Sequence, residues 1–246
     1  MNHRYFPLIL IALLAPVSAW AQSRPLPRTP DGKPDLGGYW NLPEALRFNG
    51  NLAQGKEDEV PYTPEGRQAF LNRDAADDPT AYCLPPGMPR MLHSPFPMLI
   101  IQSPGLVAEL FEYQKIWRLI YTDGRPHHAD VTDTFMGDSI GHWEDDTLVI
   151  DTVGINDRSW LDTEGHQHTA DIHLIERVMR TAPDTLHYEV TVIDPKYYSK
   201  PWTHAGDMHP IEATKGLPEL LEYFCNDNEQ DSKHFVETKD HLPNKK

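Results

Sequence analysis

Short apolar runs, some continuous and some alternating with polar residues, follow one another along the chain from residue 97 onward. The first three are MLIIQS (98–103), LVAELFEY (106–113) and KIWRLIY (115–121), separated by PG and by a single glutamine. A period of two residues places alternate side chains on opposite faces of a β-strand, and Pro-Gly is a turn former. The pattern therefore predicts three consecutive antiparallel strands.

Two hairpins are predicted further along. GHWEDDTLVIDTVG (141–154) divides into two strands at Asp145 and Asp146, and TAPDT (181–185) joins IERVMR to LHYEVTVID, in which Leu186, Tyr188, Val190 and Val192 share one face. LLEYFCN (220–226) is a further candidate strand. Helical spacing of Ile172, Ile175 and Met179 leaves a helix over 169–180 as the alternative.

The number of strands sets the fold class. About seven or eight consecutive antiparallel strands with few helical signals favour a mainly β protein, built as an up-and-down barrel or a strongly curved sheet. Barrels of this kind commonly enclose one small ligand. We assign residues 97–246 to this domain.

Residues 22–96 have a different character. Thirteen of the chain's 23 prolines lie between Gln22 and Pro97, and they forbid long strands or helices through most of this stretch. TPEGRQAFLNRDA is the exception, because Thr63 suits a helix N-cap and Pro64 suits the first helical position. We expect a proline-rich arm that wraps the barrel and contains one short helix.

Residues 1–21 have the composition of a signal peptide. A basic MNHRY precedes an apolar stretch too short to span a bilayer, and SAWA supplies small residues for cleavage after Ala21. An uncleaved membrane anchor is the alternative. We expect a periplasmic or secreted protein that begins at Gln22, carries no lipid and has no stable membrane insertion after cleavage.

The net charge indicates which kinds of partner to expect, and the cysteine content indicates whether a disulfide is to be expected. The formal net charge of −15 disfavours nucleic acid and anionic lipid surfaces as partners and suits neutral or cationic small molecules. Cys83 and Cys225 are the two cysteines of the chain. In an oxidising compartment we expect them to form one disulfide, with two buried free thiols as the alternative.

Several motifs resemble a family of exported bacterial proteins. They are PDGKPDLGGYW, CLPPGMPRM, YTDGRPH, GHWEDDTLVIDT and DPKYYSKPWT, and the likeness covers most of the chain beyond residue 21. This resemblance implies no activity, substrate or cofactor. The two hairpins are also similar, in their strands and turns, to calycin-type barrels, the lipocalin-like group that holds small ligands in a β-lined cavity.

The richest stretch for chemistry lies between Thr122 and His173. It holds six of the 13 histidines and 12 acidic residues, against Arg125 and Arg158 alone. An acidic field raises histidine pKa values and attracts cations. We expect His127 or His168 to act as general acid or base, with Asp133 or Asp162 to orient it and Arg125 to bind the ligand. A solvated acidic loop is the alternative.

A metal is a further possibility in this stretch. HQH places His166 and His168 on one side of an extended chain, as two ligands of a divalent metal site require, with a third from His127, His128 or His173. Nothing in the residues selects the third ligand. The cofactor is therefore unknown, and a divalent metal remains open.

GDSIG (137–141) matches the nucleophile-elbow pattern, but a strand rather than a helix is predicted after it, so we assign Ser139 no covalent role. Tyr113, Trp143 and Trp160 are candidates to line the ligand pocket, with core packing as the alternative.

Three functions follow in order of preference. The first is an exported enzyme, of lyase, isomerase or hydrolase type, acting on a small organic molecule. The second is a non-catalytic barrel that binds a small ligand. The third is a structural or partner-binding exported protein.

Overall fold

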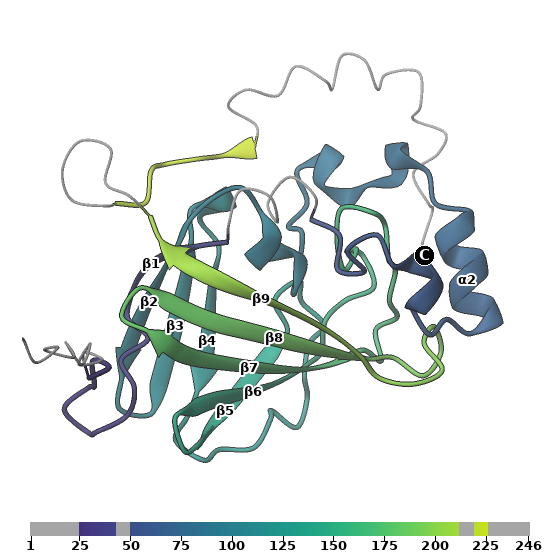
Figure 1. Ribbon diagram of the computed structural model, residues 1–246. Helices are drawn as coiled ribbons and strands as arrows, with labels where there is room; N and C mark the ends of the chain where they lie inside the picture. Colours follow the sequence, from purple (N-terminus) through teal and green to yellow (C-terminus); the bar gives the residue numbers. More distant parts are fainter. Residues whose placement is uncertain (1–24, 43–49, 212–218, 226–246) are drawn as a thin grey trace, which may run out of the picture.

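The computed structural model describes residues 25–42, 50–211 and 219–225, and nine strands within these ranges close into one β-barrel (Figure 1). The mainly β fold with a closed barrel and a short helix agrees with the class expected from the sequence. The strands are β1 (Gly38–Asn41), β2 (Met98–Ser103), β3 (Leu106–Phe111), β4 (Trp117–Tyr121), β5 (Asp138–Glu144), β6 (Thr147–Val153), β7 (His173–Ala182), β8 (Thr185–Ile193) and β9 (Trp202–Pro210).

The strands follow one another around the barrel in chain order, and all neighbours are antiparallel except β4 and β5. An odd number of strands cannot alternate in direction around a closed barrel, so one neighbouring pair must be parallel. Residues 122–137 make this possible, because they return the chain along the barrel before β5 begins. The meander expected from the sequence is therefore interrupted once, at this connection.

The arm contributes a barrel strand. β1 lies within residues 22–96 and pairs with β2 through Tyr39 and Leu99 and with β9 through Asn41 and His209. Without it, β2 and β9 would present unpaired edges. Residues 22–96 therefore do more than wrap the barrel, and its wall does not begin at residue 97.

The helical elements belong mostly to the arm. The α-helix α2 (Pro64–Leu71) begins as the sequence predicts, since Thr63 accepts a hydrogen bond from the backbone N–H of Gly66 at 3.0 Å and Pro64 follows it. Five short 3-10 helices complete the described elements: η1 (Glu57–Glu59), η2 (Ala75–Asp77), η3 (Pro79–Tyr82), η4 (Arg90–His93) and η5 (Tyr113–Lys115).

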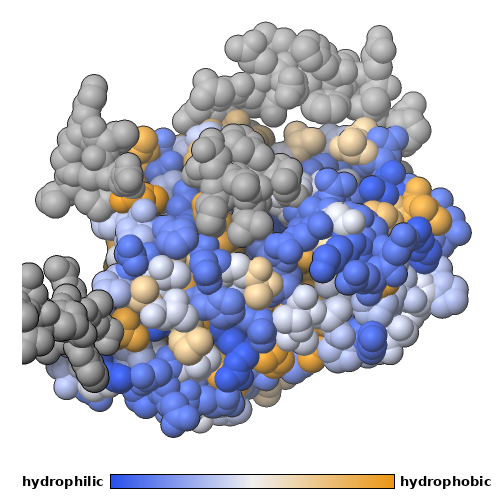
Figure 2. Space-filling model, viewed as in Figure 1, coloured by the Kyte–Doolittle hydropathy of each residue, from blue (hydrophilic) through white to orange (hydrophobic). Residues whose placement is uncertain are grey.

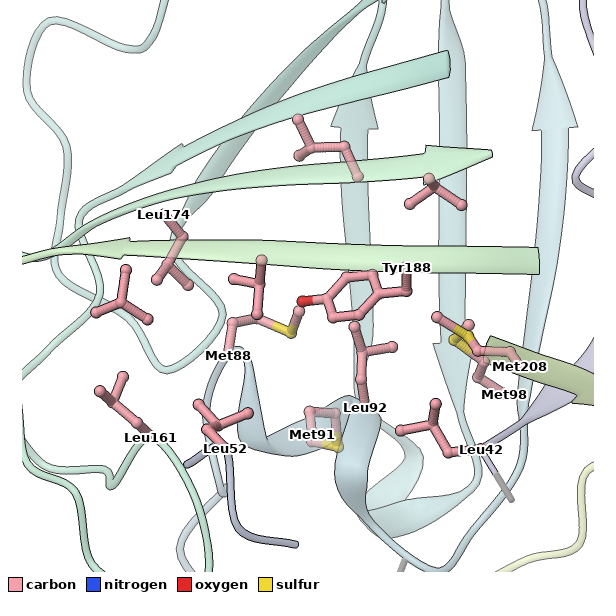
Figure 3. Close-up of a cluster of buried hydrophobic side chains, with 14 of the residues drawn as sticks. Leu42, Leu52, Met88, Met91, Leu92, Met98, Leu161, Leu174, Tyr188 and Met208 are labelled. Carbon is pink, nitrogen blue, oxygen red and sulfur yellow. The ribbon is translucent and has the colours of Figure 1, made fainter. Parts of the chain in front are cut away.

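The barrel core is shared between the strands and the arm. Leu174 of β7 and Tyr188 of β8 point inward, and Met88, Met91 and Leu92 of the arm face them from one end of the barrel (Figure 3). Met88 is fully buried. The arm therefore contributes side chains to the interior of the barrel.

The second hairpin forms as strands β7 and β8, so the helical alternative over 169–180 is wrong. The strand expected at 220–226 is also wrong, because residues 219–225 form no strand. The Cys83–Cys225 disulfide is present and ties this segment to the arm. Stacking of Tyr223 on Tyr113, with ring centroids 5.4 Å apart, holds the segment further.

Among the residues that the structure describes, no helix has the length and apolar character needed to cross a membrane. The expected signal peptide (residues 1–21) lies outside the described residues.

Candidate functional site

His127 lies between two carboxylates where the 122–137 connection meets the barrel. Its Nδ1 is 2.9 Å from Oδ2 of Asp138, the first residue of β5, and its Nε2 is 3.0 Å from Oδ1 of Asp151 on β6. An ionised carboxylate accepts hydrogen bonds and donates none, so both ring nitrogens must carry a proton to make both contacts. This geometry therefore favours an imidazolium at His127.

Two further histidines complete this histidine–aspartate network. Nε2 of His173, the first residue of β7, is 2.7 Å from Oδ1 of Asp151. His128 donates its backbone N–H to Asp138, and its Nδ1 lies 2.9 Å from the other oxygen of that carboxylate. Two imidazoles therefore meet at each carboxylate, and His127 joins the two halves of the network.

The charges of the network reinforce one another. Partial burial alone lowers the pKa of His127, but hydrogen bonds to Asp151 and Asp138 outweigh it, so the pKa is raised above 6.5. Partial burial likewise acts to raise the pKa of Asp138, yet the contacts with His127 and His128 keep it below 3.8. Each charge of the pair therefore favours the other.

A cleft of about 420 Å³ lies next to the network, and Asp138 belongs to both. Such a volume suits a small organic molecule. The side chains that line it are mainly apolar and aromatic and come from the 116–121 segment and from the loop that precedes β5: Ile116, Trp117, Leu119, Tyr121, Phe135 and Met136. Trp117 is 62% exposed, so its ring is accessible from solvent.

The parallel pairing of β4 and β5 explains why a cleft exists here. Only Ile120 and Tyr121 of β4 find partners on β5, at Ser139 and Ile140. The segment before β5 is instead held to the chain that follows β6, because Thr134 pairs with Ile155 and donates its N–H to Gly154 at 2.9 Å. The first half of β4 is left without a β5 neighbour, and the cleft occupies that side.

Arg125, expected to bind the ligand, lies near the cleft but is already paired. Its Nη2 is 2.6 Å from Asp123, and its guanidinium carbon lies 3.8 Å from the centroid of the Tyr121 ring. Asp133 is exposed in the same loop. The carboxylates that orient His127 are those of Asp138 and Asp151. The expected orienting role of Asp133 stays a prediction.

Asp162 and His168 belong to other contacts. Asp162 is fully buried and accepts from Nδ1 of His166 at 2.6 Å and from the N–H of Leu52 at 2.8 Å. Nε2 of His168 lies 3.0 Å from the hydroxyl of Ser159. Asp162 thus orients His166, and the hydrogen bonds of His168 go to residues different from those of His127.

The three aromatics expected in the pocket lie elsewhere among the described residues. The Tyr113 ring packs against Phe96 in a tilted arrangement with centroids 5.1 Å apart, Trp160 is 8% exposed, and Trp143 has the Lys33 ammonium 5.8 Å from its ring. None of the three lines the cleft. Core packing, the alternative raised by the sequence, describes Trp160, while Tyr113 and Trp143 are partly buried.

Ser139 is buried inside the barrel within an ionic cluster. Its hydroxyl accepts from Nε of Arg118 at 2.9 Å, and the Arg118 guanidinium pairs with Glu176 and lies 3.4 Å from Glu109. Burial raises the pKa of Glu109 to about 7, although the Arg118 charge acts against this. Ser139 lies within β5 and is 2% exposed, yet it also borders the cleft, so the absence of a covalent role stays a prediction.

Among the described residues, no group of three or more histidine, cysteine, aspartate or glutamate side chains has a geometry that would hold a metal ion.

A scan against protein-family models, a search of curated proteins and a search of solved structures gave no match.

The sequence pointed to the stretch that holds the histidine–aspartate network but did not identify the partners of His127. Asp138 and Asp151 lie in the 122–173 window but were not selected, and His173 was considered only as a possible metal ligand. Strand alternation offers one signal: Asp151 and His173 both fall on outward positions of their strands, next to inward-facing Thr152 and Leu174. The register between the strands was needed to bring them together.

Proposed function

We propose that the protein is an exported enzyme that binds a small organic molecule in the cleft beside β4 and transfers a proton to or from it through His127 and Asp138. The observation that supports this most is that Asp138 both lines the cleft and hydrogen-bonds to His127. A carboxylate that connects a ligand site to an imidazolium gives a proton a short path between them.

The chemistry can be stated for each residue. Asp138 would take the proton of Nδ1 of His127 along their 2.9 Å contact and pass a proton from its carboxyl group to a basic atom of the ligand. Asp151 stays hydrogen-bonded to the other nitrogen and holds the ring in place. Loss of one proton leaves His127 neutral, and its return regenerates the imidazolium. In the reverse direction, neutral His127 takes a proton from the ligand.

The cleft also indicates the kind of ligand. Trp117, Tyr121 and Phe135 offer ring faces on which an apolar or cyclic molecule can pack. Asp138 supplies a carboxylate to the lining of the cleft, in keeping with a net charge of −15. A neutral or cationic molecule with a hydrogen-bond donor fits this surface better than an anion does.

Export belongs to the same proposal. The Cys83–Cys225 disulfide is typical of oxidising compartments, and residues 1–21 have the composition of a signal peptide. We place the protein in the periplasm or outside the cell, in line with its resemblance to exported bacterial proteins.

Non-catalytic binding is the second candidate, and a specific observation favours it. Both ring nitrogens of His127 are already engaged, so the ring can serve as a fixed cation that anchors residues 122–137 and shapes the cleft. The same cleft would then hold a ligand without changing it.

The test is incubation of the full protein with a metabolite extract, followed by mass spectrometry of bound and depleted compounds. Trp117→Ala should lose retention of the compound, and His127→Gln should bind it but deplete it at least tenfold more slowly, about 1.4 kcal/mol. His187→Gln is the matched control, since His187 pairs with Asp207 at 2.7 Å on another wall.

Retention without depletion would favour the binding protein. If Trp117→Ala and His187→Gln retained every compound as the unaltered chain does, the cleft would not be the site.

A further inference from the structure

The outer face of β1–β4 is apolar. Strand register aligns the outward side chains of this face in three rows. The first row is Tyr39, Leu99, Leu110 and Trp117, and the second is Ile101, Ala108 and Leu119. The third row is Ser103, Leu106 and Tyr121, and Asn41 lies at the end of β1. None of these residues is charged.

The same strands carry their charges on the inside. Glu109 of β3 and Arg118 of β4 point into the barrel, where they are 3% and 2% exposed. Ile101 and Trp117 point outward and are 50% and 62% exposed. Apolar side chains outside and charged side chains inside reverse the arrangement of an ordinary barrel wall facing water. A contiguous apolar patch of this kind marks an interaction surface.

We propose that this face binds the same face of a second copy of the chain, so that the protein forms a two-fold symmetric dimer. Two copies that each carry −15 repel one another over most of their surfaces. The outer face of β1–β4 carries no charged side chain in its three rows, so the copies can meet there without that repulsion.

The shape of the face suits a copy of itself. Ile101 and Ala108 are direct neighbours across β2 and β3, one a protruding side chain and the other a single methyl group. A two-fold axis between them places Ile101 of each copy over Ala108 of the other. Ile101 of the first copy then contacts Ala108 of the second, and Ala108 of the first contacts Ile101 of the second, as an isologous interface requires. Sheets packed in this way lie about 10 Å apart.

The centre of this interface is separate from the cleft. Ile101 and Ala108 do not belong to the cleft lining, whereas Trp117, Leu119 and Tyr121 belong to both surfaces. A substitution at the centre therefore changes association without touching a residue that lines the cleft.

The experiment is analytical ultracentrifugation of the full chain over a range of concentrations. We expect twice the mass of the 28.1 kDa chain, and tighter association as salt is raised, because salt screens the repulsion between acidic copies. Ile101→Thr and Ala108→Leu, one removing the protrusion and the other filling the recess, should each raise the dissociation constant at least tenfold. Leu71→Gln is the matched control, since Leu71 is 58% exposed on α2.

Circular dichroism of each variant verifies that it is folded. A chain that stays monomeric at every concentration, or that binds vesicles through this face, contradicts the proposal. A dimer that either Ile101→Thr or Ala108→Leu leaves unchanged contradicts it equally.

Discussion

The two halves of the barrel wall are built from similar strands but face their surroundings differently. On β5–β9 the outward positions include many ionisable side chains: Asp138, His142, Glu144, Asp151, His173, Arg177, His187, Glu189, Asp207 and His209. On β1–β4 the outward side chains are apolar or uncharged, and Glu109 and Arg118 lie inside. The view over β7–β9 shows mostly hydrophilic residues with scattered hydrophobic ones (Figure 2).

This difference shows that alternation alone specifies a strand but not which face meets water. The outer surface of β5–β9 carries the histidine–aspartate network, and that of β1–β4 carries the proposed dimer face. The cleft lies between them, where β4 and β5 run parallel. The boundary between the two kinds of wall is therefore where ligand chemistry is proposed.

The largest expected effect is on the ionic cluster inside the barrel. Arg118→Ala should destabilise the protein by about 3–5 kcal/mol, because it leaves the buried carboxylates of Glu109 and Glu176 without their cation. Urea unfolding followed by circular dichroism measures the loss. A change below about 1 kcal/mol would mean that the cluster is open to water.

The next effect is a pH dependence that comes from Glu109. Its pKa rises from the ordinary 4.5 to about 7 on folding, so between these values the folded state holds a proton that the unfolded state has lost. Stability should therefore fall as pH rises from 4.5 to about 7 and change little from this source above 7. The free energy of unfolding of Glu109→Gln should not show this fall with pH. An equal pH dependence in both proteins would contradict the raised pKa of Glu109.

A smaller effect is expected at the outer network. His127→Gln should cost about 1 kcal/mol near pH 6, because a partly exposed cation loses its contacts with Asp138 and Asp151. His127 has a raised pKa, so its contribution is complete below 6.5 and is lost as pH rises through that raised value. The difference in unfolding free energy between the two proteins should therefore shrink by pH 9. A difference that grows with pH would show that His127 is neutral in the fold.

The smallest effect is expected at an ion pair on the outer wall. Arg177 lies 2.8 Å from Glu144, and both side chains are at least 40% exposed. Arg177→Ala should change the free energy of unfolding by less than about 1 kcal/mol, because water screens the pair. Thermal unfolding of Arg177→Ala and of Arg118→Ala compares the contributions of the two arginines to stability directly. Similar losses for both would remove the distinction between inside and outside.

Much of the barrel could be predicted from local patterns. Alternation in β7 and β8, with Pro183 and Asp184 between them, identifies a hairpin whose strands are neighbours because the turn is short. The start of α2 follows from Thr63 and Pro64 in the same way. These features depend on residues close together in the chain.

The candidate site could be predicted only in part. The density of histidines pointed to His127, but its partners come from β5 and β6, which meet the 122–137 connection only after that segment folds back along the barrel. Asp162 was selected as an orienting carboxylate, and the fold gives it to His166 instead. A sequence rich in acids cannot specify which acid each histidine meets.

The sequence by itself therefore determined strands β2–β8, the two hairpins and the start of the helix, and it predicted the Cys83–Cys225 disulfide. Turn chemistry and side-chain periodicity act over a few residues, and two cysteines allow one disulfide. The tertiary structure alone decided that β1 closes the barrel, that β4 and β5 run parallel, and that Asp138 and Asp151 hold His127. These contacts join residues far apart in the chain, and the energy that selects them comes from completing the barrel and its core rather than from any local preference.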